Sequence, residues 1–218
     1  ANPWVQESSQ RQFLTRAIKS LQLSKNDLVI SSDCDEIPKL SVIESMKGKS
    51  VNHLLELRNY TNYINVESGV YRRGRVASGD NFFSVEKMRQ DCYIFDNWTS
   101  RRFSFPVMRV PKAFTCRRME IPIPELVFKR PRLNVIENGG WHFNHLLRGD
   151  SLNRKVIFSS HTELVDRARN LSIESALASA QDIYRRQDTK VVKIDNSFPR
   201  YVQENLHKLE DYIYPTDG

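Results

Sequence analysis

The stretch Leu28-Val29-Ile30-Ser31-Ser32-Asp33-Cys34-Asp35-Glu36-Ile37-Pro38 places three acidic side chains directly after a short apolar run. The run 28–30 reads as a buried strand of a parallel sheet. Asp33 and Asp35 are two positions apart, so on an extended segment their side chains point to the same side. At the carboxyl end of a parallel strand they would face the ligand crevice of an open sheet. The stretch therefore predicts an α/β fold with a functional site at this point.

Carboxylates in this position are suited to a divalent metal ion. Asp33 and Asp35 would supply hard oxygen ligands to Mg²⁺ or Mn²⁺, which in turn would bridge a nucleotide diphosphate. The alternative is that Asp33 caps a helix and Asp35 is a solvated turn residue. Three acids in four positions after an apolar strand favour the metal site.

A second candidate is Gly139-Gly140-Trp141-His142-Phe143. Paired glycines permit close approach of the backbone to a ligand. Trp141 could stack on a sugar face, and His142 could bind metal or donate to a phosphate. The alternative is a pair of core aromatic residues in a turn, beside a histidine with satisfied hydrogen bonds.

A third candidate is Lys155 followed by Ser159-Ser160-His161-Thr162-Glu163. Lys155 could hold a phosphate, His161 could be a further metal ligand, and Glu163 could be a general base. A surface helix explains these residues equally well.

The periodicity of the chain predicts further elements around these motifs. Phe13, Ala17, Ile18 and Leu21 form an apolar stripe on a helix spanning residues 4–23. Residues 66–132 mix glycine, arginine and aromatic side chains, so short strands and long loops are expected there. Other expected strands cover 53–63 and 134–143, the latter entering a turn at the paired glycines, and expected helices cover 42–46, 151–159, 163–170, 173–185 and 198–209.

Composition restricts the classes of protein. The chain has 218 residues, a net charge of +7 and 39% hydrophobic residues, which indicates a folded domain and favours anionic partners. No run approaches the roughly 18 apolar residues of a membrane-spanning helix. Cys34, Cys92 and Cys116 contain no Cys-x-x-Cys pair, which argues against a zinc knuckle.

Taken in order, the motifs resemble glycosyltransferase family 17. The matching pieces are Trp4, Glu7, Gln10 and Arg11, then 27–38, 139–143, and Lys155 with 160–163. The resemblance implies a GT-A fold, a nucleotide-sugar donor such as UDP-GlcNAc, a Mn²⁺ or Mg²⁺ ion, and inversion at the anomeric carbon. The acceptor would be a carbohydrate or glycoprotein.

In that family the acidic motif follows a nucleotide-binding first half, whereas here it arrives at residue 33. We therefore expect residues 1–218 to form a single GT-A-like catalytic domain that lacks its N-terminal strands. An inverting displacement also needs a carboxylate base that is not occupied by metal. Glu163 is favoured because it lies beside His161, with Asp150 and Glu36 as further candidates.

Two other classes of function remain open. In a haloacid-dehalogenase-like phosphohydrolase, Asp33 would be the nucleophile and Asp35 the acid/base. A basic nucleic-acid-binding module would fit the charge and the 10% aromatic residues. No recognisable nucleic-acid-binding motif is present, so nucleic acid is not the expected partner.

Overall fold

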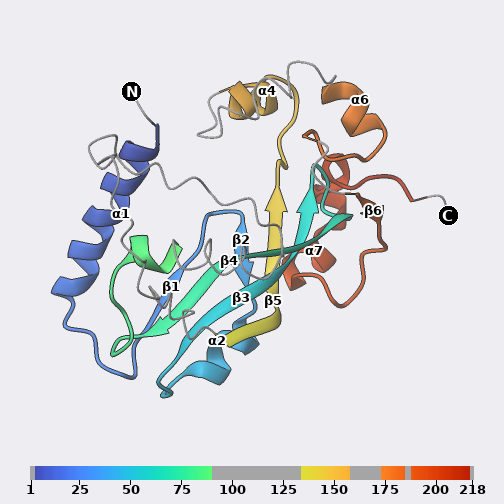
Figure 1. Cartoon of the computed structure of the whole chain (residues 1–218). Coiled ribbons are helices and arrows are strands. Elements are labelled where there is room, and N and C mark those ends of the chain that lie inside the picture. The colour runs from blue at the N-terminus through green and yellow to red at the C-terminus, as the bar shows by residue number, and fades with distance from the viewer. Residues whose placement is uncertain (1–2, 90–133, 158–172, 185–187, 217–218) are drawn as a thin grey trace, which may run out of the picture.

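The computed structural model describes residues 3–89, 134–157, 173–184 and 188–216. A curled mixed sheet lies at the centre, with α1 beside one edge and α4 and α6 beyond one end (Figure 1). The elements are α1 (Pro3–Ser20), β1 (Leu28–Ser31), β2 (Glu36–Pro38), α2 (Leu40–Met46), β3 (Asn52–Thr61), β4 (Val66–Ser78), β5 (Asn134–Asn144), α4 (Gly149–Ile157), α6 (Ile173–Ala178), β6 (Lys190–Val191), α7 (Arg200–Glu204) and the 3-10 turns η2 (Leu206–Lys208) and η3 (Glu210–Tyr212).

The sheet confirms an α/β fold. Its strand order is β1-β4-β3-β5-β2, and β6 pairs with β4. β3 and β5 run parallel, and the other pairs described are antiparallel. Such a mixture is common in α/β sheets that carry antiparallel strands at their edges.

The expected orientation of the first strand was wrong. β1 pairs antiparallel with β4 and lies at the end of the strand order. Ile30 is accordingly exposed. A three-residue apolar run indicates a strand but carries no information about the direction of its neighbour, which here is set by the hairpin of β3 and β4.

The glycine-containing strands also differ from expectation. Residues 66–78 form one strand of 13 residues rather than several short ones, and β5 continues through the paired glycines without turning. A Cβ on Gly140 would lie 2.2 Å from the carbonyl oxygen of Ile37. Glycine is therefore needed at this position for close packing against β2, and not for a turn.

Three helices lie where the sequence predicts them, and two predicted helices near the C-terminus are shorter than expected. α1, α2 and α4 lie where helices were expected, although Phe13 and Leu21 of the predicted stripe are exposed. The helix expected over 173–185 ends at Ala178, and that over 198–209 is divided into α7 and the 3-10 turn η2. The helix expected over 163–170 lies outside the described residues. No described helix has the length and hydropathy needed to cross a membrane.

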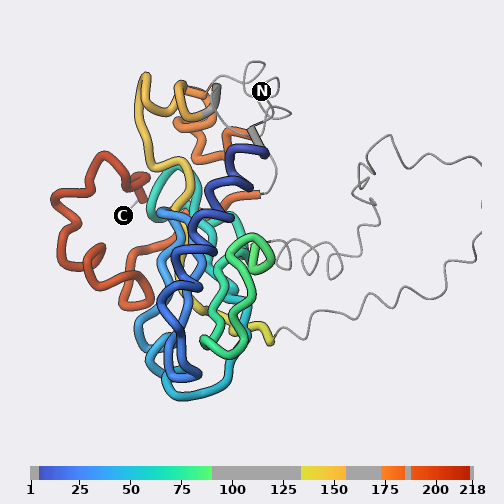
Figure 2. The backbone as a smooth tube through the Cα atoms, turned by 90° about the vertical axis from the view of Figure 1, so that its left-hand side faces the viewer, coloured from blue at the N-terminus to red at the C-terminus, as the bar shows by residue number. Residues whose placement is uncertain are grey.

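Both faces of the sheet are packed. The C-terminal segment (red) lies on one side of the sheet, and helical residues 85–89 (green) lie on the other (Figure 2). The cluster that packs α7 against β3 and β5 contains Tyr60, Trp141, Phe143, Phe198 and Val202. α2 packs through a second cluster, which contains Met46, Val51, Leu55, Leu57 and Val76.

On the opposite side from α2, α1 packs against the β1–β4 edge. Ile18 contacts a cluster of Val29, Ala77 and Met88. This contact holds α1 next to the loop that follows β1.

Gly140 offers a direct test of the β2–β5 packing. Gly140→Ala would drive a methyl group into the backbone of β2, so we expect it to lower the free energy of unfolding by about 1–3 kcal/mol. The matched control is Gly74→Ala, whose Cβ would make an ordinary 3.5 Å contact with Leu55, and this variant should be nearly neutral. Urea unfolding of the two variants measures the difference, and equal midpoints would contradict the proposed close approach.

Candidate functional site

The acidic motif forms the connection between β1 and β2. β2 pairs with β5 so that Glu36 lies opposite His142. The backbone N–H of Phe143 donates a hydrogen bond of 2.9 Å to the carbonyl of Asp35. The structure thus brings together two motifs that lie about a hundred residues apart in the sequence.

Arg89 holds one side of this connection. Its Nη1 and Nη2 donate to the two carboxylate oxygens of Glu36 at 3.0 and 3.1 Å, and its Nη2 also pairs with Asp33. The backbone N–H of Asp33 donates to Glu36 at 3.0 Å. The side chain of Glu36 is fully buried, whereas that of Asp33 is 55% exposed. Glu36 therefore fixes the turn from inside while Asp33 faces outward.

The burial of this cluster shifts several pKa values. Loss of solvent raises the pKa of the Glu36 carboxyl, and the hydrogen bonds from Arg89 oppose that rise. Burial disfavours the charged form of Arg89, but its contacts with Glu36 and Asp33 outweigh this and raise the pKa of the guanidinium. Burial, followed by the charge of Glu36, raises the pKa of Tyr71 to about 12. Arg89 thus stays charged and Tyr71 stays neutral.

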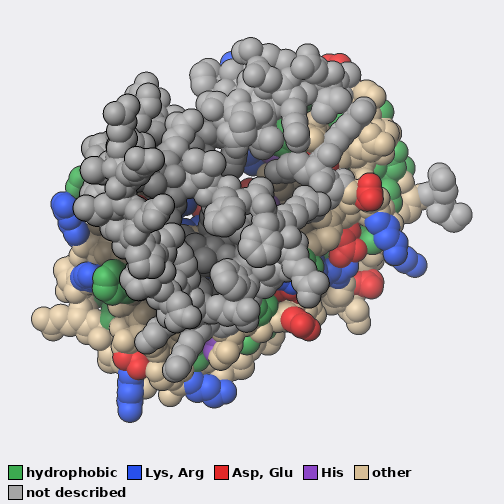
Figure 3. All heavy atoms as spheres, in the orientation of Figure 1, with side chains coloured by type: hydrophobic (Ala, Val, Ile, Leu, Met, Phe, Trp, Pro, Cys, Tyr) green, Lys and Arg blue, Asp and Glu red, His purple; other side chains and the backbone are tan. Residues whose placement is uncertain are grey.

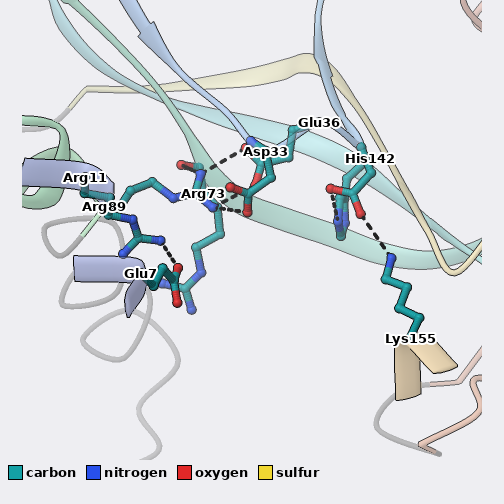
Figure 4. Close-up of polar contacts among 9 residues, drawn as sticks. Glu7, Arg11, Asp33, Glu36, Arg73, Arg89, His142 and Lys155 are labelled. Atoms are coloured by element: carbon teal, nitrogen blue, oxygen red, sulfur yellow. Dashed lines mark hydrogen bonds and ion pairs between the residues drawn. The ribbon is translucent and has the colours of Figure 1, made fainter. Parts of the chain in front are cut away.

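Asp35 faces the other side. Its Oδ1 lies 3.7 Å from Nε2 of His142, and its Oδ2 lies 3.6 Å from Nζ of Lys155. Figure 4 shows Arg89 approaching from the side of α1 and Lys155 approaching from α4 on the opposite side. The two aspartates of the motif therefore have separate cationic partners.

His142 is tightly enclosed. Its ring stacks on Tyr71 with a centroid separation of 3.9 Å and an interplanar angle of 17°. Its Nδ1 lies 2.6 Å from Oδ1 of Asn59, and Asn59 donates from Nδ2 to Oγ of Ser68 at 2.7 Å. The imidazole is thus held in one plane, with Nε2 directed toward Asp35.

Trp141 lies on the opposite face of β5 from His142, because neighbouring side chains alternate along a strand. The indole is buried in the cluster with α7, and its Nε1–H donates to the carbonyl of Ser197 at 3.0 Å. Nζ of Lys39 lies 5.1 Å from the ring centroid. Trp141 therefore serves the core here, in agreement with the alternative interpretation of the motif, and does not border the Asp35 side.

The candidate bases are placed differently. Asp150 is exposed in the first turn of α4. Both oxygens of Glu36 are bound by Arg89, which argues against Glu36 as a base. Glu163 and His161 lie outside the described residues, as do Cys92 and Cys116.

The N-terminal motif lies beside the acidic loop. Glu7 and Arg11 pair with each other one turn apart on α1. Figure 4 shows both on the same side as Arg89, with Arg73 of β4 pointing toward them. α1, which carries Glu7 and Arg11, therefore lies beside the Asp33 side of the site.

Several residues of the site were not predicted from the sequence. Arg89 lies in a stretch that contained no motif, and Asn59 and Tyr71 lie within strands. Only the strand register brings the latter two to the site, because it places Asn59 opposite His142 and Tyr71 opposite Leu57.

The donor set fits an open metal site. Among the described residues no group of three or more His, Cys, Asp or Glu side chains could enclose an ion. Asp35 and His142 are nevertheless close enough to share one, because ligand bonds to such ions are about 2.0–2.2 Å long. Mg²⁺ typically keeps several waters and binds through one or two carboxylates plus substrate phosphates. The site therefore fits a metal that arrives with a diphosphate.

Charged side chains of both signs are visible on the face of the molecule drawn in Figure 3. Figure 3 shows basic and acidic side chains interspersed over the part of this face that the structure describes. The net charge of +7 therefore does not produce a single basic patch on the described part of this face.

Removing Arg89 tests its role. Arg89→Met would leave the buried Glu36 carboxylate without a counter-charge, so we expect it to destabilise the chain by about 3–5 kcal/mol. Adding Glu36→Gln to this variant should recover part of the loss. The control is Arg200→Met, which breaks an exposed pair with Glu204 and should not change the unfolding midpoint. Denaturant unfolding measures all three variants, and a neutral Arg89→Met would contradict the assigned role.

Comparison with known proteins supports the resemblance drawn from the sequence. Residues 1–75, which contain α1, the acidic loop and β3, match the family model described as glycosyltransferase family 17. Neither the curated proteins nor the solved structures contain a match to this chain. The match covers about a third of the 218 residues, and over that part the chain is similar to glycosyltransferase family 17.

Proposed function

We propose that this chain is a metal-dependent, inverting glycosyltransferase of the GT-A type. It transfers N-acetylglucosamine from UDP-GlcNAc to a hydroxyl of a carbohydrate or glycoprotein acceptor, such as an N-glycan. The family match supports sugar transfer, and the resemblance supplies the donor, the acceptor class and the stereochemistry. The observation that carries the metal assignment is the position of Asp35 between His142 and Lys155.

The two aspartates have different roles in this proposal. Asp35 and His142 hold Mn²⁺ or Mg²⁺, and His161 is a further candidate ligand. Asp33 is engaged by Arg89 and half exposed, which suits a hydrogen bond to the ribose of the donor better than a share in the metal. Arg89 orients Asp33 for that contact.

When bound, the metal offsets the negative charge that develops on the diphosphate leaving group. Lys155 can add to this by pairing with a phosphate oxygen, since its side chain on α4 is 39% exposed. Lys155 would thus be a second positive partner of the phosphates, beside the metal that Asp35 and His142 would hold.

The base that activates the acceptor hydroxyl is a carboxylate free of metal. We favour Glu163, which follows the metal-ligand candidate His161 in the sequence, and Asp150 is the second candidate. Trp141 is not needed for stacking in this proposal, because its indole is packed in the core.

The other two functions receive less support. A phosphohydrolase would need a nucleophilic Asp33, but the pairing with Arg89 stabilises that carboxylate and weakens it as a nucleophile. A nucleic-acid-binding module would be indicated by a concentrated basic surface. The described part of the face in Figure 3 carries side chains of both charges instead.

The division between the aspartates can be measured by calorimetry with UDP and Mn²⁺. Asp35→Asn should weaken Mn²⁺-dependent UDP binding by at least about tenfold, because it removes a charged ligand. Asp33→Asn should weaken UDP binding while leaving its dependence on Mn²⁺ in place. Asp188→Asn, at an exposed position, is the control. Unchanged Mn²⁺-dependent affinity in Asp35→Asn would refute the metal assignment.

The proposed base has its own test. Loss of a general base typically slows the reaction by about 10²–10⁴-fold while leaving binding intact. Glu163→Gln should therefore bind UDP-GlcNAc normally and transfer poorly, with Asp150→Asn as the comparison. Full turnover in Glu163→Gln would transfer the role to Asp150. NMR of the product should show an inverted anomeric centre, and retention would overturn the mechanism.

A further inference from the structure

The side chain of Asn59 faces the ring nitrogen of His142 that points away from Asp35. The two residues are partners in the parallel register of β3 and β5. Oδ1 of Asn59 lies 2.6 Å from Nδ1 of His142. Asn59 is not among the residues that carry the family resemblance, and the site motifs of the sequence do not include it.

A second contact is compatible with this orientation of the Asn59 amide, in which the oxygen faces the imidazole. Nδ2 of Asn59 donates to Oγ of Ser68 at 2.7 Å, and the carbonyl oxygen of the same amide is turned toward His142. Ser68 is itself buried in β4. Three neighbouring strands therefore contribute one residue each to a short hydrogen-bonded chain.

This orientation has a consequence for the proton on the imidazole. An amide oxygen only accepts hydrogen bonds, so Nδ1 of His142 must carry the hydrogen. In the neutral ring Nε2 then carries the lone pair, and Nε2 is the nitrogen that faces Asp35 at 3.7 Å. A lone pair beside a carboxylate is repelled by it, unless a proton on Nε2 or a shared metal cation lies between the two groups.

We propose that Asn59 is a positioning residue that sets the tautomer of His142 and so makes Nε2 a ligand for a divalent cation shared with Asp35. The inference rests on the metal role in the proposed function. Partners that hold the second nitrogen of a ligating histidine commonly affect metal affinity by about 10–100-fold. Stacking on Tyr71 supports the same role, because it keeps the ring in the plane that points Nε2 at Asp35.

The tautomer can be read directly from the wild-type protein. With ¹⁵N-labelled histidine, two-bond ¹H–¹⁵N spectra at mildly alkaline pH distinguish the two neutral forms, and loss of signals in His142→Gln identifies the residue. We expect the Nδ1–H form in wild type without metal. Finding the Nε2–H form would overturn the proposal without any variant of Asn59.

Metal affinity supplies the second measurement, with Mn²⁺ alone as the probe. Asn59→Leu should weaken Mn²⁺ binding by about 10–100-fold and shift His142 toward the Nε2–H form. Asn59→Asp still accepts from Nδ1 and should keep both the tautomer and near-wild-type affinity. Ser68→Ala frees the amide to rotate and should give an intermediate result, which also covers the case in which Asn59→Leu does not fold.

Asn65→Leu is the matched control. Asn65 is a buried asparagine that hydrogen-bonds the backbone of Tyr214, so its loss should lower stability without changing Mn²⁺ affinity. If Asn59→Leu behaves in the same way as this control, Asn59 is only structural and the proposal fails. If wild type and His142→Gln bind Mn²⁺ alike while sugar transfer persists, this inference fails and the proposed transferase activity stands.

Discussion

The charge-assisted hydrogen bonds between Arg89 and Glu36 are the interaction on which the candidate site depends. A fully buried carboxylate is costly unless it is paired and hydrogen-bonded, and Arg89 satisfies both oxygens of Glu36. Glu36 then accepts from the backbone of Asp33, which closes the turn of the acidic motif. Since Arg89 also reaches Asp33, one guanidinium fixes the turn and orients the outward-facing acid.

The second constraint is the pairing of β2 with β5, which sets the acidic loop against His142. This pairing needs Gly140, because a larger residue would collide with Ile37. The paired glycines were interpreted as a turn or a point of ligand approach, and they are instead a point where two strands approach each other. The site is therefore built by backbone contacts between segments far apart in the sequence, and side chains complete it.

The sequence predicted local elements better than their arrangement. The apolar run 28–30, the strand around Leu55 and the α2 helix were found because periodicity and proline placement are local signals. The direction of β1 was missed, since it depends on the β3–β4 hairpin. The acidic loop and His142 were recognised as candidates, whereas Arg89 and Asn59 were not. The role of Asn59 arises from strand pairing and that of Arg89 from the packing of helical residues 85–89 next to the acidic loop, and residue types alone reveal neither.

Asp33 and Asp35 each have a cationic partner of their own, Arg89 and Lys155. These partners offset the repulsion between the two carboxylates, so both acids can occupy one short motif. Arg89 is buried and bound by several acceptors, so it is a permanent partner of Asp33 and Glu36. Lys155 is a flexible, partly exposed ammonium 3.6 Å from Asp35, and a lysine at such a distance is a replaceable partner. Exchange of Lys155 from the carboxylate to a phosphate would keep each charge compensated as a diphosphate and its metal enter. The asymmetry in burial between Arg89 and Lys155 thus assigns a fixed role to Asp33 and an exchangeable one to Asp35.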